Sequence, residues 1–152
     1  MSKITPFLWF DGQAEEAMNF YVSVFRDAKI THVTPGPGGK AMWVSAEILG
    51  QTFYALNGGP EYKFTEAISM FVDCDDQAQV DDLWTKLTAD GGEESKCGWL
   101  KDKYGLSWQI IPKALSQLLG DPDPAKAQRV MQAMLKMKKI DVAELQKAAR
   151  GE

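Results

Sequence analysis

The side chains best suited to catalysis are few and lie far apart in this sequence. The chain has one histidine, His32, and two cysteines, Cys74 and Cys97. An imidazole can act as a general base near neutral pH, but no serine or cysteine accompanies His32 at a recognisable spacing. The two cysteines lie far apart and do not form a C-x-x-C pair. Isolated cysteines of this kind are typical of reduced thiols in a cytoplasmic protein. We therefore interpret His32 as an ordinary strand residue and neither cysteine as a nucleophile.

A glycine-rich segment, PGPGGK (35–40), raises the question of phosphate binding. A Walker loop requires G-x-x-x-x-G-K-[ST], but Thr34 occupies the first glycine position and Ala41 follows Lys40. We interpret the segment as a Gly/Pro-rich connection between strands. The sequence therefore does not predict a nucleotide site here.

The composition is that of a soluble globular protein, with a length that suits one domain or two small halves sharing a core. The chain has 152 residues, of which 45% are hydrophobic and 25% charged. Its apolar runs are too short to cross a bilayer, and MSKITPFLWFDGQAEE has no signal segment, so we expect a cytoplasmic protein without a membrane partner. The net charge of −4 argues against a nucleic-acid partner, because no basic patch is available to bind phosphates.

The first 112 residues contain an internal repeat. ITPFLWFDGQAEEAMNFYVSVF (4–25) aligns with AISMFVDCDDQAQVDDLWTKLT (67–88). In each, an apolar strand leads through an aspartate-containing turn into an amphipathic helix. The apolar helix positions coincide and mark one face. These matching pairs are Ala17 and Val80, Phe20 and Leu83, Tyr21 and Trp84, and Val24 and Leu87.

Each helix is followed by further strand-forming segments. In the first half these are ITHVT (30–34) and MWVSAEILGQTFYALN (42–57), the latter predicting a type II′ hairpin at Gly50–Gln51. In the second half, Gly91–Gly92 ends the helix and two strands flank Asp102–Gly105, while the second strand is hard to place. The chain therefore predicts an α+β fold of two tandem β-α-β-β-β modules, approximately 1–60 and 61–112, forming a curved mixed sheet cleft.

The C-terminal extension, residues 113–152, lies outside the repeat. Asp123–Pro124 predicts a helix start, and Asp141 with Glu144 resembles a capping box that opens a last helix. We expect these helices to cover the sheet or a partner subunit. Their apolar positions are Ala127, Val130, Met131, Met134 and Leu135 in the first helix and Val142, Leu145, Ala148 and Ala149 in the second.

Two stretches resemble a known family. FLWFDGQAEEAMNFYVSVF is similar to the opening of the PhnB-like (demethylubiquinone methyltransferase-like) proteins. GWLKDKYGLSWQIIP (98–112), followed by DPDPAKAQRVMQAMLKMKKIDVAELQKA, is similar to their closing segments. These proteins belong to the vicinal oxygen chelate superfamily, with glyoxalase I, extradiol dioxygenases and bleomycin-resistance proteins. The resemblance implies eight strands curved into a cleft, commonly completed in a homodimer.

The resemblance also implies where a metal would bind. Metal-using members offer His, Gln or Glu ligands on the first and last strand of each module, positions that fall near Pro6, Tyr54, Ser69 and Gln109 here. This set lacks the usual quartet, so we predict no metal cofactor, although a slip of one or two residues would bring Glu47 or Asp73 near the cleft. No strand is followed by G-x-G-x-x-G and a helix, so the sequence does not favour methyltransferase activity.

Aromatic residues are concentrated on the predicted strands. They are Trp9, Trp43, Trp99 and Trp108, with Tyr54 and Phe71. Alternation along a strand sends some rings into the core and others into the cleft, where they suit a small, partly apolar ligand. The residues predicted to bind this ligand are Trp9, Trp43, Tyr54, Ser69, Trp108 and Gln109.

These observations lead to three functional hypotheses. The first is a small-molecule-binding protein, expected to be a homodimer without a catalytic metal, which either only binds its ligand or carries out a metal-independent reaction on it. The alternative is a metal-dependent glyoxalase- or dioxygenase-type enzyme. The third is an interaction protein that acts through its C-terminal helices. The sequence does not identify the ligand.

Overall fold

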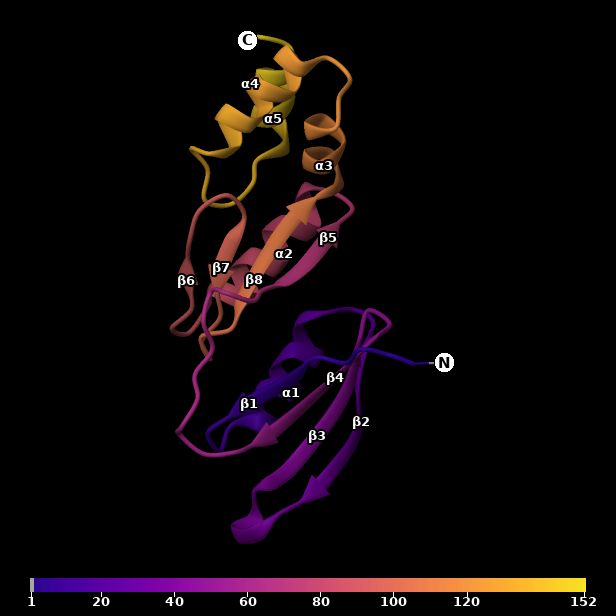
Figure 1. Cartoon of the computed structure of the whole chain (residues 1–152), viewed down its shortest axis with the longest axis vertical. Helices are drawn as coiled ribbons and strands as arrows, with labels where there is room; N and C mark the ends of the chain where they lie inside the picture. The colour runs from indigo at the N-terminus through magenta and orange to yellow at the C-terminus, as the bar shows by residue number, and fades with distance from the viewer. Residues whose placement is uncertain (1) are drawn as a thin grey trace. The chain divides into compact units, whose positions relative to one another are not determined.

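The computed structural model describes residues 2–152, and the chain forms two compact units. The first unit ends at Phe64 and the second begins at Thr65 (Figure 1). Each contains a four-stranded mixed sheet with a helix packed on one face, and the second also contains three C-terminal helices. The predicted α+β fold with two β-α-β-β-β modules is confirmed.

The sheet of the first unit has the order β1-β4-β3-β2. Strands β1 and β4 pair in parallel, whereas β3 pairs antiparallel with both β4 and β2. A parallel pair needs a crossover connection, and this connection contains the helix α1. The elements are β1 (Phe7–Phe10), α1 (Ala14–Val24), β2 (Ala28–Pro35), the short 3-10 helix η1 (Pro37–Gly39), β3 (Ala41–Ile48) and β4 (Gln51–Asn57).

The sheet of the second unit repeats this order as β5-β8-β7-β6, with β5 and β8 parallel. The strand that the sequence left unplaced is β6, which has only two residues. Helix α3 was not predicted from the sequence; it begins directly after β8. The elements are β5 (Met70–Cys74), α2 (Gln77–Thr88), β6 (Glu93–Glu94), β7 (Trp99–Lys101), β8 (Ser107–Pro112), α3 (Lys113–Leu119), α4 (Pro124–Met134) and α5 (Val142–Ala149).

The predicted helix faces agree with the burial of the side chains except at one position. In α2 all four predicted residues are buried, whereas in α1 Phe20 is only half-buried and the unpredicted Met18 is fully buried. The buried set comprises Ala14, Ala17, Met18, Tyr21 and Val24 in α1 and Val80, Leu83, Trp84 and Leu87 in α2.

The turn between β3 and β4 differs from the predicted type II′ turn. Ile48 pairs with Gln51, so the two turn residues are Leu49 and Gly50, with φ angles of 50° and 81°. Positive φ at both central residues is the requirement of a type I′ turn, whose twist matches that of the flanking strands. The sequence prediction was wrong because it placed the turn one residue too late.

The two modules start their helices in different ways. Asp76 caps α2 as predicted, with its carboxylate accepting a hydrogen bond from the Gln79 backbone N–H. In α1 no nearby side chain forms a cap; instead Asn57, at the end of β4, accepts from the Ala14 N–H at 2.9 Å. The same amide donates to the Ala41 carbonyl at 2.7 Å, so Asn57 ties the helix start to two strands.

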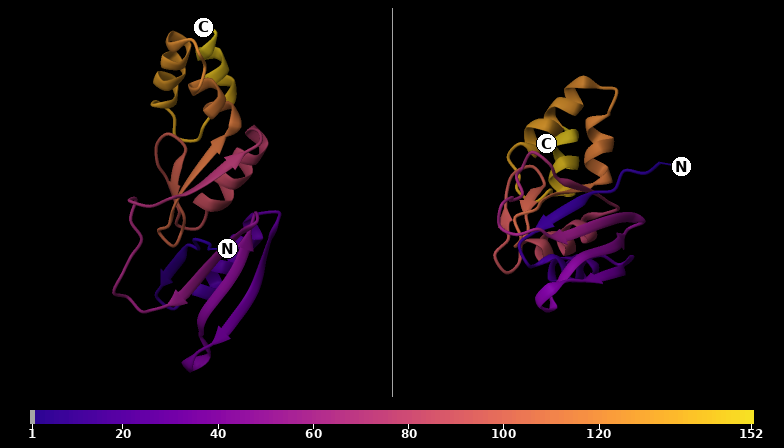
Figure 2. Two further views of the ribbon diagram at one scale, coloured as in Figure 1. Left: turned by 45° about the vertical axis from the view of Figure 1, so that its right-hand side comes forward. Right: turned by 60° about the horizontal axis from the view of Figure 1, so that its bottom comes forward.

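The three C-terminal helices pack within the second unit, where Figure 2 shows them gathered as one bundle. Gln77 of α2 donates to the Ile140 carbonyl and accepts from the Val142 N–H, which anchors the start of α5. The predicted caps Asp123 and Asp141 are both present. The buried cluster consists of Ile111, Leu115, Val130, Ile140, Leu145 and Ala149.

Only part of the predicted stripe on α4 is covered. Val130 is fully buried, but Met131 is 37% and Leu135 52% exposed. The exposed part of this stripe does not make α4 a membrane helix: within residues 2–152, no helix combines the length and apolarity needed to cross a membrane.

The loop before β7 is held by the loop between α4 and α5. The backbone N–H groups of Cys97 and Gly98 each donate at 2.8 Å, to the carbonyls of Met137 and Lys138. Gly98 has a φ of 86°, and a Cβ there would lie 2.6 Å from the Ile111 side chain and 3.1 Å from that of Ile140. The close approach of these side chains therefore requires glycine at position 98.

The bundle predicts a large contrast between two apolar truncations. Ile140→Ala removes a side chain that is fully buried, so it should lower the free energy of unfolding by about 2–4 kcal/mol. The matched change Leu135→Ala, at a half-exposed position, should cost less than about 1 kcal/mol. Urea unfolding followed by circular dichroism measures both, and equal losses would contradict the packing of the tail on this unit.

Candidate functional site

The open face of the first sheet, opposite α1, carries an aromatic cluster. Along β1, β3 and β4, residues that alternate with the buried ones lie on this face. Phe7 is the strand partner of Tyr54, and the Trp43 ring lies 5.1 Å from that of Phe7 and 4.6 Å from that of Tyr54. We call Phe7, Trp43 and Tyr54 the aromatic platform. Phe7 is 50% exposed, so the platform offers apolar ring surface to solvent.

Polar side chains border the aromatic platform. Ser45 is the strand partner of both Tyr54 and His32, which places all three on one face. The Ser45 hydroxyl forms a hydrogen bond of 2.8 Å with that of Thr31. The His32 Nε2 lies 2.9 Å from the Thr34 hydroxyl. The Ser45 hydroxyl and the His32 imidazole therefore lie on the same face as the platform, on strands that neighbour one another.

The sequence did not reveal this position of His32. The register between β2 and β3 shifts between Ile30 and His32, which is a β-bulge. A bulge breaks the alternation on which a sequence prediction of faces depends. His32 is therefore a candidate ligand contact as well as a strand residue.

Trp9 lies beside the platform but is held by its own neighbours. Its indole N–H donates to the Gly59 carbonyl at 2.9 Å, and its ring meets that of Tyr62 at 4.9 Å. A Cβ on Gly58 would lie 2.3 Å from the Trp9 ring, so the chain after β4 presses directly on the indole. The only hydrogen-bond donor of the Trp9 side chain is therefore already bonded. The Trp43 ring contacts the aromatic rings of Phe7 and Tyr54.

The open face of the second sheet brings Ser69 and Gln109 together. The Gln109 amide N–H donates to the Ser69 hydroxyl at 2.9 Å, across a separation of 40 residues in sequence. In the sheet Gln109 lies between Phe71 and Trp99. Its amide oxygen has no hydrogen-bond donor among residues 2–152, and its strand partner Phe71 is 56% exposed.

Trp108 does not belong to this face. Its side chain is 2% exposed, and its indole N–H donates to the Asp102 carboxylate at 2.8 Å. Asp102 is itself buried and also accepts hydrogen bonds from the backbone N–H groups of Tyr104 and Leu106. The prediction that Trp108 contacts the ligand is therefore corrected: Trp108 is a core residue that anchors the β7–β8 turn.

The donor atoms at the family's metal positions do not fit a divalent ion. Gln109 offers one amide oxygen, Ser69 and Tyr54 offer neutral hydroxyls, and Pro6 has no ligand atom. Glu47, considered as an alternative, lies 3.6 Å from Lys29 in an exposed ion pair. In the part of the chain that the structure describes, no three His, Cys, Asp or Glu side chains are grouped to hold a metal.

Cys74 is chemically protected by its position. The side chain is fully buried, and burial is the main cause that raises the pKa of its thiol to about 11, with Asp73 and Asp75 adding to the effect. Since the thiolate is the reactive form, Cys74 is a poor nucleophile at neutral pH. Cys97 is only half-buried.

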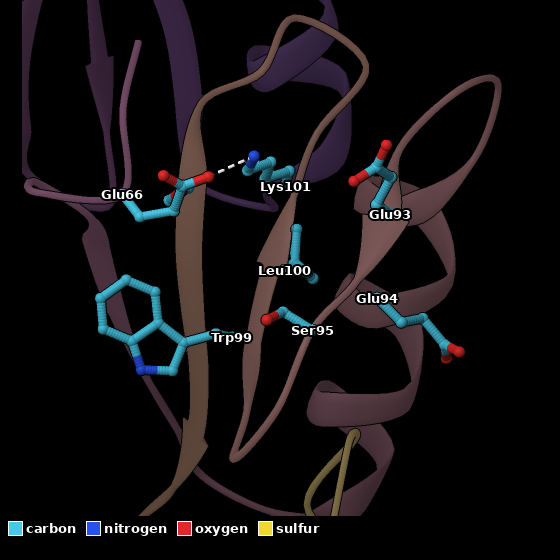
Figure 3. Close-up of a pocket in the computed structure, with 8 residues that line it drawn as sticks. Glu66, Glu93, Glu94, Ser95, Trp99, Leu100 and Lys101 are labelled. Atoms are coloured by element: carbon cyan, nitrogen blue, oxygen red, sulfur yellow. Dashed lines mark ion pairs between the residues drawn. The ribbon is translucent and has the colours of Figure 1, made fainter.

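A hollow that the sequence did not predict lies in the second unit beside β6 and β7 (Figure 3). Its volume is about 180 Å³. Lys101 and Glu66 form an ion pair at its mouth, which raises the pKa of the lysine and lowers the pKa of the glutamate. No motif marks this site, because its strand β6 is too short to show a pattern. The lining residues are Glu66, Glu93, Glu94, Ser95, Trp99, Leu100, Lys101 and Ser107.

Comparison with known proteins identifies relatives of most of the chain. The family model for 3-demethylubiquinone-9 3-methyltransferase matches residues 2–111. A PhnB protein from Bacillus cereus, named after the same methyltransferase, is 32% identical, with a TM-score of 0.68; the match covers 73% of this chain and 99% of that one. No match was found among the curated proteins.

More distant solved structures share the fold. A protein from Pseudomonas aeruginosa is 19% identical with a TM-score of 0.63, and the match covers 74% of this chain and 98% of that one. A glyoxalase/bleomycin resistance protein from Albidiferax ferrireducens is 13% identical with a TM-score of 0.53, covering 73% and 98%. The predicted membership of the PhnB-like family is confirmed by the family model and the Bacillus cereus protein, and these more distant structures confirm the predicted fold.

The different surroundings of the two cysteines predict different reactivity. In native protein near pH 8, a thiol reagent such as Ellman's reagent should modify Cys97 well before Cys74, because the raised pKa keeps Cys74 almost entirely protonated. Raising the pH towards 11 should accelerate the Cys74 reaction, and the variant Cys97→Ser should remove the fast phase. A fast phase that survives in Cys97→Ser would contradict the burial of Cys74.

Proposed function

Because the chain belongs to the 3-demethylubiquinone-9 3-methyltransferase family, and its donor atoms do not fit a metal site, we propose that it binds a small, partly apolar organic molecule without a catalytic metal. The observation that carries the proposal is the aromatic platform of Phe7, Trp43 and Tyr54. The platform is preformed by ring contacts of 4.6–5.7 Å and bordered by hydroxyl groups. Such a combination suits recognition of a ring-containing ligand.

The ligand contacts follow from the chemistry of the face. A planar ring would stack on Trp43 and Tyr54, and a polar substituent would reach Ser45 or His32. On the second sheet we propose Ser69 and Gln109 as polar ligand contacts, since the Gln109 amide oxygen is available to accept a hydrogen bond. Trp9 is retained as an apolar contact only, because its N–H is bonded to Gly59.

The family name does not carry over as an activity. Methyl transfer needs a donor molecule, and the chain lacks the G-x-G-x-x-G loop after a strand with which many methyltransferases hold one. A homodimer and a cytoplasmic location, both expected from the sequence, are part of the same proposal. Sedimentation of the purified chain measures the first of these directly.

Substitution on the platform tests the binding proposal. In a thermal-shift screen of phenols, benzoates and indoles, compounds that stabilise the protein should lose at least about tenfold in affinity for Trp43→Ala, because a central aromatic contact is removed. Gln109→Ala should fold normally and weaken compounds that bind on the second sheet, because it removes the amide oxygen that would accept their hydrogen bond. The matched control is Met42→Ala, an exposed neighbour on the same strand whose side chain points to the opposite face. Equal affinity of Trp43→Ala and the parent protein would contradict the assignment.

Metal content tests the other half of the proposal. Tag-free protein should retain less than stoichiometric metal after incubation with nickel, cobalt, manganese, iron or zinc and dialysis, as measured by inductively coupled plasma mass spectrometry. The reason is the neutral character of the available donors. One firmly retained ion per chain would favour the metal-dependent enzyme instead.

A further inference from the structure

We propose that the second unit carries a binding site for a small organic cation, in the hollow beside β6 and β7. This site goes beyond the proposed function, because it would take a charged ligand and lies in the second unit, whereas the aromatic platform belongs to the first. It adjoins the Ser69–Gln109 pair, since Trp99 is the strand partner of Gln109. Three features of the hollow carry the inference: an unsatisfied buried hydroxyl, an excess of carboxylates and an adjoining indole. Figure 3 shows the carboxylates and the indole that line the hollow.

The buried hydroxyl belongs to Ser107 on β8. Its side chain is 1% exposed, and its Oγ has no hydrogen-bond partner among the residues that the structure describes. A buried polar atom without a partner costs free energy, and native proteins leave few of them. Ser107 lines the hollow, so a molecule bound there can supply the missing hydrogen bond.

The charge of the hollow favours a cation. Three carboxylates, those of Glu66, Glu93 and Glu94, line the hollow together with one ammonium group, that of Lys101. Lys101 is paired with Glu66, and Glu93 is its strand partner on β6. Glu94 instead accepts a hydrogen bond from the Trp84 indole at 2.7 Å and points away from the ion pair in Figure 3. Glu93 is therefore the carboxylate left to bind a positively charged group.

The ion pair also limits what Lys101 can do. Its hydrogen bond with Glu66 raises the pKa of the lysine, so the amine stays protonated and cannot act as a nucleophile towards a carbonyl group. An anionic ligand would have to displace Glu66 from Lys101 and would meet Glu93 as well. Both effects disfavour anions and leave a cation as the better occupant.

Trp99 and the size of the hollow define the remainder of the ligand. An indole is the best aromatic partner of an organic ammonium or guanidinium group, and Trp99 is half-buried at the edge of the hollow. A volume of about 180 Å³ is comparable to the ~150 Å³ cavity that holds one benzene molecule. The site thus suits an ammonium group carried on a ring or a short chain. It does not suit a bare divalent ion, for which no group of three ligands is present in residues 2–152.

Paired probes of opposite charge test the site. Benzylammonium, titrated into the intact chain and followed by two-dimensional amide NMR, should shift the signals of Trp99, Lys101 and Ser107. Benzoate, of the same size and opposite charge, should leave these signals in place. Equal shifts with benzoate, or no shifts with benzylammonium, would overturn the proposal.

Variants then separate this site from the aromatic platform. Glu93→Gln should weaken benzylammonium about fivefold or more, because a charge-assisted hydrogen bond is lost at an exposed position. Ser107→Ala should also weaken the probe, without lowering the melting temperature of the free protein, since it removes an unsatisfied hydroxyl. Glu144→Gln, an exposed carboxylate on α5, is the control and should have no effect.

The outcome is independent of the proposed function. Trp43→Ala should bind benzylammonium as tightly as the parent protein, whereas Glu93→Gln should bind the ring compounds of the platform unchanged. Loss of benzylammonium binding in Trp43→Ala but not in Glu93→Gln would place the probe on the platform and overturn the second site. Failure of the platform compounds to bind would leave the cation result standing on its own.

Discussion

Parallel pairing between the first and last strand of each unit determines where every candidate residue lies. Strands joined by a tight turn must be antiparallel, so a parallel pair forces the chain to cross a face of the sheet, and the crossing segments contain α1 and α2. One face of each sheet is then covered by a helix, and the alternate side chains are left on the other. The aromatic platform and the Ser69–Gln109 pair both exist because of this arrangement.

The two units share one strand order but present chemically different surfaces. The open face of the first sheet is aromatic, with hydroxyl groups at its border, whereas the hollow of the second is acidic and contains one paired lysine. Side chains on the open face do not hold the sheet to its helix, so they can differ between the units while the buried ones keep their pattern. The two repeats therefore share their fold and their buried pattern, whereas the side chains on their open faces differ.

Much of this could be predicted from the sequence, for identifiable reasons. The helices follow from the 3.6-residue spacing of buried positions such as Val80 and Leu87, and their starts follow from aspartate caps such as Asp76. Trp108 was misplaced although alternation alone separates it from its neighbour Gln109, since successive strand residues point to opposite faces. His32 and β6 could not be placed, because a bulge and a two-residue strand leave no periodic signal. Glu66 and Lys101 meet only through tertiary folding.

The helices α3, α4 and α5 lie beyond the part of the chain that the family model matches, which ends at residue 111. They are nevertheless built into the unit that precedes them. Two backbone amides of the loop before β7 donate to this extension, and the Ile140 side chain approaches Gly98 so closely that a Cβ there would lie 3.1 Å from it. The extension is thus not a detachable module. A chimera that transfers it to a shorter family member would also have to receive a glycine at the position of Gly98 and the glutamine of α2.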